Sequence, residues 1–399
     1  MRGKVSTIVF LIAGLMFQTA CNRDTKDTSL VVLPDEILDT KFSLTDIAED
    51  LLIIPLSSNY PVQRFQKVVW YDSCFYYFSQ NQIVRFTEGG HFVDVLDKVG
   101  RGPEQYLSCY EFQIHEATGE IFILDRWKIQ VYSGSFNHKR TIKLPGPEAE
   151  AVKMRIVKDN IHIFYHGYEK EGLLWAMTDM SGNVINSSYA VDLYEARSLD
   201  ESQVFENNGK LYRFYNKNDT IYEIDSSGIR PYRLINRDFR DGFHLIKNPT
   251  SSSTRENPST YREIRSIYGI GDFWQINFTK VHYTRRNPIE NESVLYNTRE
   301  NVFYIIGNSL AKPGAQGSIG IQNDWAGHGY FLPFGELTIS NRKYLLRVYD
   351  ASEYLSMVND SEFRNGIPSR ADIKTRMISV ADSLTHDDNP VLILLKLKN

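Results

Sequence analysis

The sequence predicts an all-β fold, a six-bladed β-propeller with short helical segments before a C-terminal closing strand. A pair of short strands recurs six times, the first aromatic-rich and the second ending in a turn, at intervals of roughly 40 to 60 residues. Two further apolar strands, at residues 51–56 and 391–396, have no blade of their own. Because an unpaired strand edge promotes aggregation, we expect these two strands to pair and close the ring.

Residues 1–21 resemble a bacterial lipoprotein signal. Two basic residues precede an apolar run at residues 5–17, which is too short for a membrane span. Small residues then lead to Cys21, which such a signal makes the lipidated first residue of the mature chain. Gln18 departs from the usual motif, in which Leu is common at that place. The alternative is ordinary signal cleavage nearby, with Cys21 unlipidated.

The remainder of the chain divides into a tether and one domain. Residues 22–42 begin with a polar, charged stretch, and we expect them to form a flexible tether between membrane and domain. Residues 43–399 form the propeller, which opens with a short helix at 43–50. Two more helical segments are predicted near residues 351–358 and 370–384, before the closing strand.

The six blades follow from the repeated strand pairs. Residues 109–144 show the pattern most plainly, because four short strands alternate with turn residues and no helical period interrupts them. Such a sheet cannot bury both faces alone, so it requires similar neighbours. The sixth pair, residues 330–333 and 344–349, is the least regular, since Pro333 must lie at an edge or a strand end. The predicted blades span residues 66–98, 109–144, 152–190, 202–235, 264–306 and 318–349, the last completed by the termini.

Four stretches carry a family resemblance. Residues 99–106 and 119–131 resemble NHL-type propeller repeats. With the stretches LTDIAEDLLIIPL at 44–56, GRGPEQY at 100–106 and DNPVLILLKLK at 388–398, the chain is more closely similar to bacterial six-bladed β-propeller lipoproteins of unknown function. Glu104 and Gln105 depart from the Gly-Glu usual in that family, and the lost glycine removes easy access to positive φ. The resemblance implies architecture and envelope location, and brings no catalytic residues.

Composition excludes several functions. The formal net charge of −4 gives no basic field, so we expect no nucleic-acid partner. Cys74 and Cys109 remain after processing, and we interpret them as two buried thiols, with a disulfide as the alternative. His162 and His166 have a spacing that two zinc ligands use, but a third ligand is not evident, so no metal is predicted. No catalytic or cofactor-binding motif occurs, and no cofactor is predicted.

A ligand-binding rim is predicted on one face of the propeller, where the second-to-third-strand loops and the linkers between blades emerge. Two long loops, residues 238–262 and 279–291, fall on the same face, and long loops in compact folds are commonly functional. The alternative is decoration without a ligand. Of these candidates, we expect Asp125 to cap the strand turn rather than touch a ligand, and Trp127 suits packing between blades as readily as stacking on a ligand. The predicted rim residues are Arg101, Glu104, Asp125, Arg126, Trp127, His166, Tyr215, Lys217, Arg285 and Arg286.

These observations favour a non-catalytic binding or scaffolding module in the cell envelope. We expect an N-terminal lipid to attach it to a membrane, at the periplasmic or surface face of the outer membrane, and the rim to engage a glycan, peptide or partner protein. The alternative is a propeller hydrolase or lyase that acts on a polysaccharide or a lactone at the axial opening. An enzyme should cluster several carboxylates with a basic residue at the channel mouth, whereas a binding module should show an aromatic or mixed rim with dispersed charges.

Overall fold

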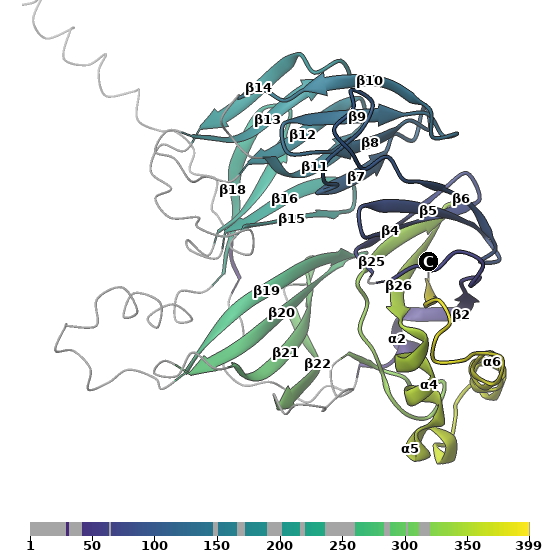
Figure 1. Ribbon diagram of the computed structural model, residues 1–399. Helices are drawn as coiled ribbons and strands as arrows, with labels where there is room; N and C mark the ends of the chain where they lie inside the picture. The colour runs from purple at the N-terminus through teal and green to yellow at the C-terminus, as the bar shows by residue number, and fades with distance from the viewer. Residues whose placement is uncertain are drawn as a thin grey trace, which may run out of the picture.

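The computed structural model describes residues 29–31, 42–63, 65–146, 151–165, 172–189, 202–215, 220–235, 260–282, 288–300, 302–310 and 320–398. Over these residues the chain forms six sheets arranged as blades around one axis, which confirms the predicted six-bladed β-propeller (Figure 1). In the first five blades the strand nearest the axis comes first in the sequence. Consecutive strands within a blade pair antiparallel, as expected of short hairpins.

The strands of the first three blades are β3 (Lys67–Tyr71), β4 (Cys74–Ser79), β5 (Gln82–Thr87), β6 (Phe92–Leu96), β7 (Glu111–Ile114), β8 (Ile121–Leu124), β9 (Lys128–Tyr132), β10 (His138–Lys143), β11 (Ala151–Val157), β12 (Asn160–Tyr165), β13 (Leu173–Asp179) and β14 (Val184–Tyr189). Those of the fourth and fifth blades are β15 (Ser202–Asn207), β16 (Lys210–Tyr215), β17 (Thr220–Asp225), β18 (Gly228–Ile235), β19 (Thr260–Ile270), β20 (Phe273–His282), β21 (Pro288–Asn297) and β22 (Val302–Leu310).

Apolar side chains fill the spaces between neighbouring blades. The second strand of a blade is buried on both faces; all four residues of β8, for example, are buried. One cluster joins Tyr76 and Phe78 of the first blade to Phe112 and Ile123 of the second. This packing explains the recurrence of aromatic residues in the repeat, because each sheet covers its neighbour.

Strands from opposite ends of the chain close the ring, as predicted. The sixth blade has the order β2 (Ala48–Pro55), β27 (Val391–Leu397), β26 (Arg342–Tyr349) and β25 (Gly335–Ile339), with β25 nearest the axis. β2 pairs antiparallel with β27, placing Leu52 opposite Leu394. The first five residues of β27 are buried, since this strand lies in the interior of its sheet.

The strand assignment within the sixth blade differs from the sequence prediction. Residues 330–333 do not form the second strand; β24 (Tyr330–Phe331) pairs only with β23 (Ile321–Gln322) in a small separate sheet. Pro333 has no N–H to donate to a ladder and ends that strand. The backbone N–H of Phe334 then donates to the carbonyl of Leu346, starting the inner hairpin of β25 and β26.

The helices lie beside the closing blade (Figure 1). α2 (Leu44–Ile47) is shorter than the predicted helix at 43–50, because β2 begins at Ala48. The two predicted C-terminal segments are present as α4 (Ala351–Asn359) and α6 (Ala371–Asp382), with α5 (Ser361–Asn365) between them. Tyr354 of α4 is buried and its hydroxyl donates to the carbonyl of Met377 in α6.

A short strand lies within the predicted tether. β1 (Ser29–Val31) pairs in parallel with β18, at the outer edge of the fourth blade. An outer edge strand carries unpaired N–H and C=O groups, which β1 satisfies over three residues. Part of the predicted tether therefore adds to a blade.

Both described cysteines are free thiols. Cys109 is buried, as predicted, and burial raises the pKa of its thiol well above the ordinary value. Cys74 is partly exposed, because it begins β4 beside the turn that follows β3. The buried-thiol interpretation therefore holds fully for Cys109 alone.

Candidate functional site

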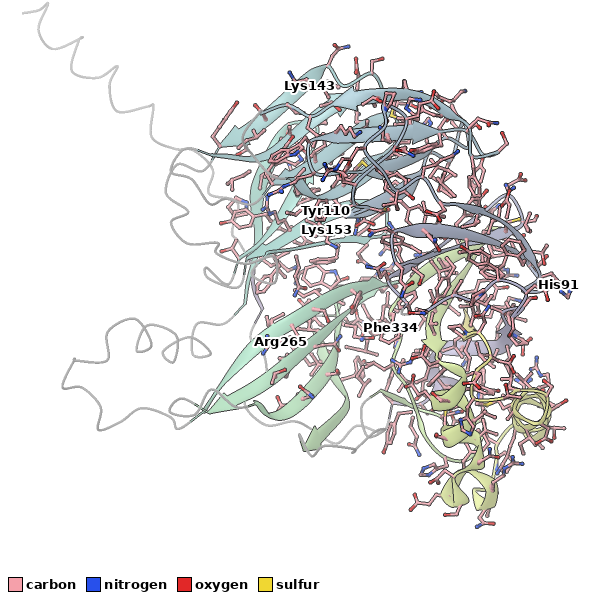
Figure 2. The ribbon with its side chains drawn as sticks, in the orientation of Figure 1. His91, Tyr110, Lys143, Lys153, Arg265 and Phe334 are labelled. Carbon is pink, nitrogen blue, oxygen red and sulfur yellow. The ribbon has the colours of Figure 1, made fainter. Side chains whose placement is uncertain are left out.

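The strands nearest the axis enclose a channel. A cavity of about 1040 Å³ is lined by residues from β3, β7, β11, β15, β19 and β25, one strand from each blade. The faces of each sheet pack against neighbouring blades, so the open inner edges of these strands border the channel, and consecutive residues of β15 and β19 line it. In Figure 2, Tyr110, Lys153, Arg265 and Phe334 lie around the central space, whereas His91 and Lys143 lie at the outside.

The channel has the opposite sign of charge to the whole chain. The whole sequence has a formal net charge of −4. The channel lining contains five basic side chains and three carboxylates, a formal excess of two positive charges. These charged lining residues are Lys67, Lys153, Arg155, Arg265, Lys343, Glu111, Glu206 and Glu336.

Glu111, the first residue of β7, lies between three cations. Its Oε1 accepts a hydrogen bond from Lys67 Nζ at 2.6 Å, and its Oε2 accepts one from Arg155 Nη1 at 2.7 Å. Lys153 Nζ lies 3.8 Å from the same Oε2. Burial raises the pKa of this carboxyl, but Arg155, Lys67 and Lys153 together outweigh burial and lower it. Glu111 is therefore an ionised carboxylate with both oxygens engaged.

The protonation of Lys67 is made less favourable by its burial and by the other cations beside it. Its ammonium also donates to the carbonyl of Phe112 at 2.8 Å. Burial lowers the Lys67 pKa to about 8; Glu111 acts to raise it, and Arg155 and Lys153 act to lower it further. One carboxylate does not fully compensate three cations.

The other two carboxylates differ from each other. Glu336 of β25 accepts a hydrogen bond from the backbone N–H of Gly271 and pairs with Lys343 Nζ at 2.9 Å. Glu206 of β15 is exposed to the channel, and partial desolvation there raises the pKa of its carboxyl, with Arg155 acting in the opposite direction and Glu116 adding to the rise. Glu206 therefore holds a proton at higher pH than an ordinary glutamate.

Aromatic rings accompany these charges. Phe65 stacks on Phe334, with ring centroids 5.5 Å apart and an interplanar angle of 22°. The guanidinium of Arg347 lies 4.1 Å from the centroid of the Phe334 ring, within range of a cation–π interaction. Tyr110 and Tyr268 also line the channel. The site thus combines flat apolar faces with an excess of positive charge.

Comparison with known proteins identifies the family. The family described as Domain of unknown function (DUF4934) matches residues 31–396. The chain belongs to the DUF4934 family. A search of curated proteins finds no significant match.

Solved structures are similar to this DUF4934 chain. A crystal structure from Bacteroides fragilis, described as a "Putative exported protein", is similar with a TM-score of 0.63 and 16% identity, covering 93% of this chain and 100% of that one. A member of the duf4221 family from Bacteroides vulgatus has a TM-score of 0.46 and 12% identity, covering 88% of this chain and 97% of that one. At 16% identity, the likeness to the Bacteroides fragilis structure is one of fold alone.

Among the described residues of the DUF4934 chain, no helix has both the length and the apolar character needed to span a membrane. The described residues also contain no cluster of three or more His, Cys, Asp or Glu side chains arranged for a metal ion. His162 is buried, and Trp175 Nε1 donates to its Nδ1 at 3.3 Å. Burial lowers the His162 pKa to about 4, so this imidazole is neutral at physiological pH.

Five predicted rim residues are described, and none of them lines the channel. The Asp125 carboxylate is buried and accepts hydrogen bonds from the backbone N–H groups of Leu107, Ser108 and Arg126, at 3.1, 3.3 and 2.8 Å. This geometry is that of the capping role that the sequence favoured for Asp125 over ligand contact. The Arg126 guanidinium lies 4.8 Å from the centroid of the Trp127 ring, whose residue is 49% exposed. Arg101 and Glu104 are exposed on the preceding linker.

The other predicted functional residues are not described by the structure. His166, Lys217, Arg285, Arg286 and Cys21 lie outside the described residues, as does the side chain of Tyr215 at the end of β16. Their roles remain predictions.

The sequence prediction missed the channel residues, although the sequence contains a signal for them. Lys67, Glu111 and Arg155 are each 44 residues apart and lie on the inner strands of three consecutive blades. Charged residues that recur at the spacing of the blades, beside buried apolar residues, mark positions on the inner strands that line the channel. The prediction concentrated instead on loops.

Proposed function

We propose that this DUF4934 protein is a non-catalytic binding module of the cell envelope, whose ligand enters the axial channel. The observation that supports this most directly is the cavity of about 1040 Å³, where aromatic rings and charged groups converge from all six blades. Ligand sites are typically concave, with apolar walls and a few placed polar groups, and this volume is at the upper end of their range. A glycan or an extended peptide suits such a channel better than a folded partner.

The engagement of Glu111 and Glu336, two of the three channel carboxylates, argues for binding rather than catalysis. A glycosidase needs one protonated and one ionised carboxyl flanking the scissile bond. Both oxygens of Glu111 already accept from cations, and Glu336 accepts from Gly271 and Lys343. Neither carboxylate is positioned as an unengaged base or nucleophile.

Envelope location is part of the same proposal. The signal-like residues 1–21 and the candidate lipidation site Cys21 support it, as does the description of the Bacteroides fragilis relative in fold as exported. We expect the wild-type protein to fractionate with membranes and to incorporate labelled palmitate. A Cys21→Ser variant that stays membrane-bound would contradict lipid anchoring.

A channel-filling substitution tests the proposed site. Thr338 is an exposed channel residue on β25, and Thr338→Trp would occupy the space a ligand needs. Val184→Trp, on the exposed outer strand β14, is the matched control. In glycan-array and peptide-library screens, Thr338→Trp should lose the ligands that wild type and Val184→Trp retain. Undiminished binding by a folded Thr338→Trp protein would place the ligand elsewhere.

Glu206 supports a second candidate function, a polysaccharide hydrolase or lyase. The charges in the channel are clustered, as expected of an enzyme, and the raised pKa of Glu206 suits a general acid. Turnover of a polysaccharide or lactone panel that is abolished by Glu206→Gln would establish this function. Asp125 is a poor probe of catalysis, because its carboxylate holds backbone groups of the blade.

A further inference from the structure

We propose that the channel selects acidic oligosaccharides, with Lys153 supplying an ammonium group that binds a carboxylate or sulfate of the ligand. This inference rests on the proposed function and specifies the chemical class of ligand. It follows from the placement of charge on the inner strands, from the exposure of Lys153 and from the aromatic rings beside it.

The charge excess is local and built into the strands. Lys153 and Arg155 stand two residues apart on β11 and both line the channel, while the intervening Met154 is buried in the core between blades. With Lys67 they place three positive charges around the single carboxylate of Glu111. A channel with low-dielectric walls focuses such a field toward a ligand of opposite charge.

The three cations are not equivalent. Lys67 and Arg155 make short hydrogen bonds to the two oxygens of Glu111. Lys153 lies farther away, at 3.8 Å, and its side chain is 44% exposed to the channel. Lys153 is therefore the cation of this group that is best placed to exchange part of its interaction with Glu111 for a ligand anion.

The depressed pKa of Lys67 supports the same conclusion. Burial and the neighbouring cations disfavour its charged form, so a bound anion would relieve the repulsion and raise this pKa again. Anion binding should therefore be accompanied by proton uptake near pH 8.

The aromatic rings favour sugars among possible anions. Phe65 and Phe334 form a stacked pair at the channel wall, and Tyr110 and Tyr268 present further rings. Aromatic faces pack against the apolar faces of sugar rings, and cations pair with acidic substituents. A small inorganic anion would use only the second feature.

The test compares three probes of similar length by calorimetry on the purified full chain. They are a galacturonic acid oligomer, a sulfated chondroitin oligosaccharide and a neutral cello-oligosaccharide. The acidic probes should bind at least tenfold more tightly than the neutral probe, with affinity falling as salt increases. Preference between the two acidic probes identifies carboxylate or sulfate as the recognised group.

Substitutions at Lys153 locate the effect. Lys153→Ala should weaken acidic probes roughly tenfold or more, the value of one charge-assisted contact, and Lys153→Arg should retain most of the affinity. Glu111 keeps Lys67 and Arg155 in both variants, so we expect them to fold. Lys143→Ala removes the same charge from exposed β10, at the outside of the molecule, and should bind as wild type does (Figure 2).

Three results would overturn the inference. Binding of the neutral probe as tightly as the acidic ones, with loss in Thr338→Trp, would refute anion selection while leaving the proposed channel function intact. Absence of any acidic-probe binding, together with no proton uptake near pH 8 when inorganic sulfate is added, would refute an anion site in the channel. Loss of binding in Lys143→Ala to the same extent as in Lys153→Ala would also refute the role of Lys153.

Discussion

The Glu111→Gln substitution tests the electrostatic organisation of the channel most directly. Gln keeps the shape of the side chain but removes its charge, so three cations lose their shared counter-ion. Only 5% of the Glu111 side chain is exposed, and its two short contacts are charge-assisted. Removing one partner from a buried ion pair costs about 3–5 kcal/mol. Because Lys67 remains 25% exposed in the channel, solvent offsets part of this loss.

We therefore expect Glu111→Gln to reduce the free energy of unfolding by about 3 kcal/mol at pH 7. Urea denaturation followed by tryptophan fluorescence measures the difference, and Asp372→Asn, in an exposed pair with Arg370, should match wild type. The folded Glu111 pKa is depressed, so its contribution is fully present above the ordinary glutamate pKa of about 4.3. It is lost as pH falls through the lower folded pKa, and the two proteins should converge there. A variant as stable as wild type at pH 7 would refute the reasoning.

Three further predictions follow from specific contacts. Lys67 should titrate near pH 8 in NMR spectra of carbon-13-dimethylated protein, and a midpoint near 10.4 would contradict the packing of cations around it. Because the unfolded lysine keeps its proton up to about pH 10.4, the free energy of unfolding should rise between pH 8 and that value. Leu394→Ala, in the buried closing strand, should lower the free energy of unfolding by about 2–5 kcal/mol in chemical denaturation. An unchanged free energy of unfolding would argue against closure through β27. Asp125→Ala should lower the free energy of unfolding by about 1–3 kcal/mol, because the N–H groups of Leu107, Ser108 and Arg126 lose their acceptor. Channel ligands should still bind to this variant, whereas loss of binding with unchanged stability would support a rim role for Asp125.

The sequence by itself determined the blades and their closure. Alternating short strands and turns, repeated six times, leave no way to bury both faces of each sheet except against similar sheets. The apolar strands at the two ends of the chain were likewise expected to pair with each other, and β2 pairs with β27 in the sixth blade. The failure at residues 330–333 arose because an aromatic dipeptide before Pro333 resembles a blade strand until its pairing partners are known.

Only the tertiary structure decided which charged residues act together. Lys67, Glu111 and Arg155 belong to separate blades, and no local pattern pairs them, although their 44-residue spacing matches the blade repeat. Packing of neighbouring blades brings equivalent positions of successive inner strands within hydrogen-bond distance along the channel wall. Burial there then sets the pKa of each group, and neither the closing distance nor the loss of solvent can be calculated from the linear order of residues.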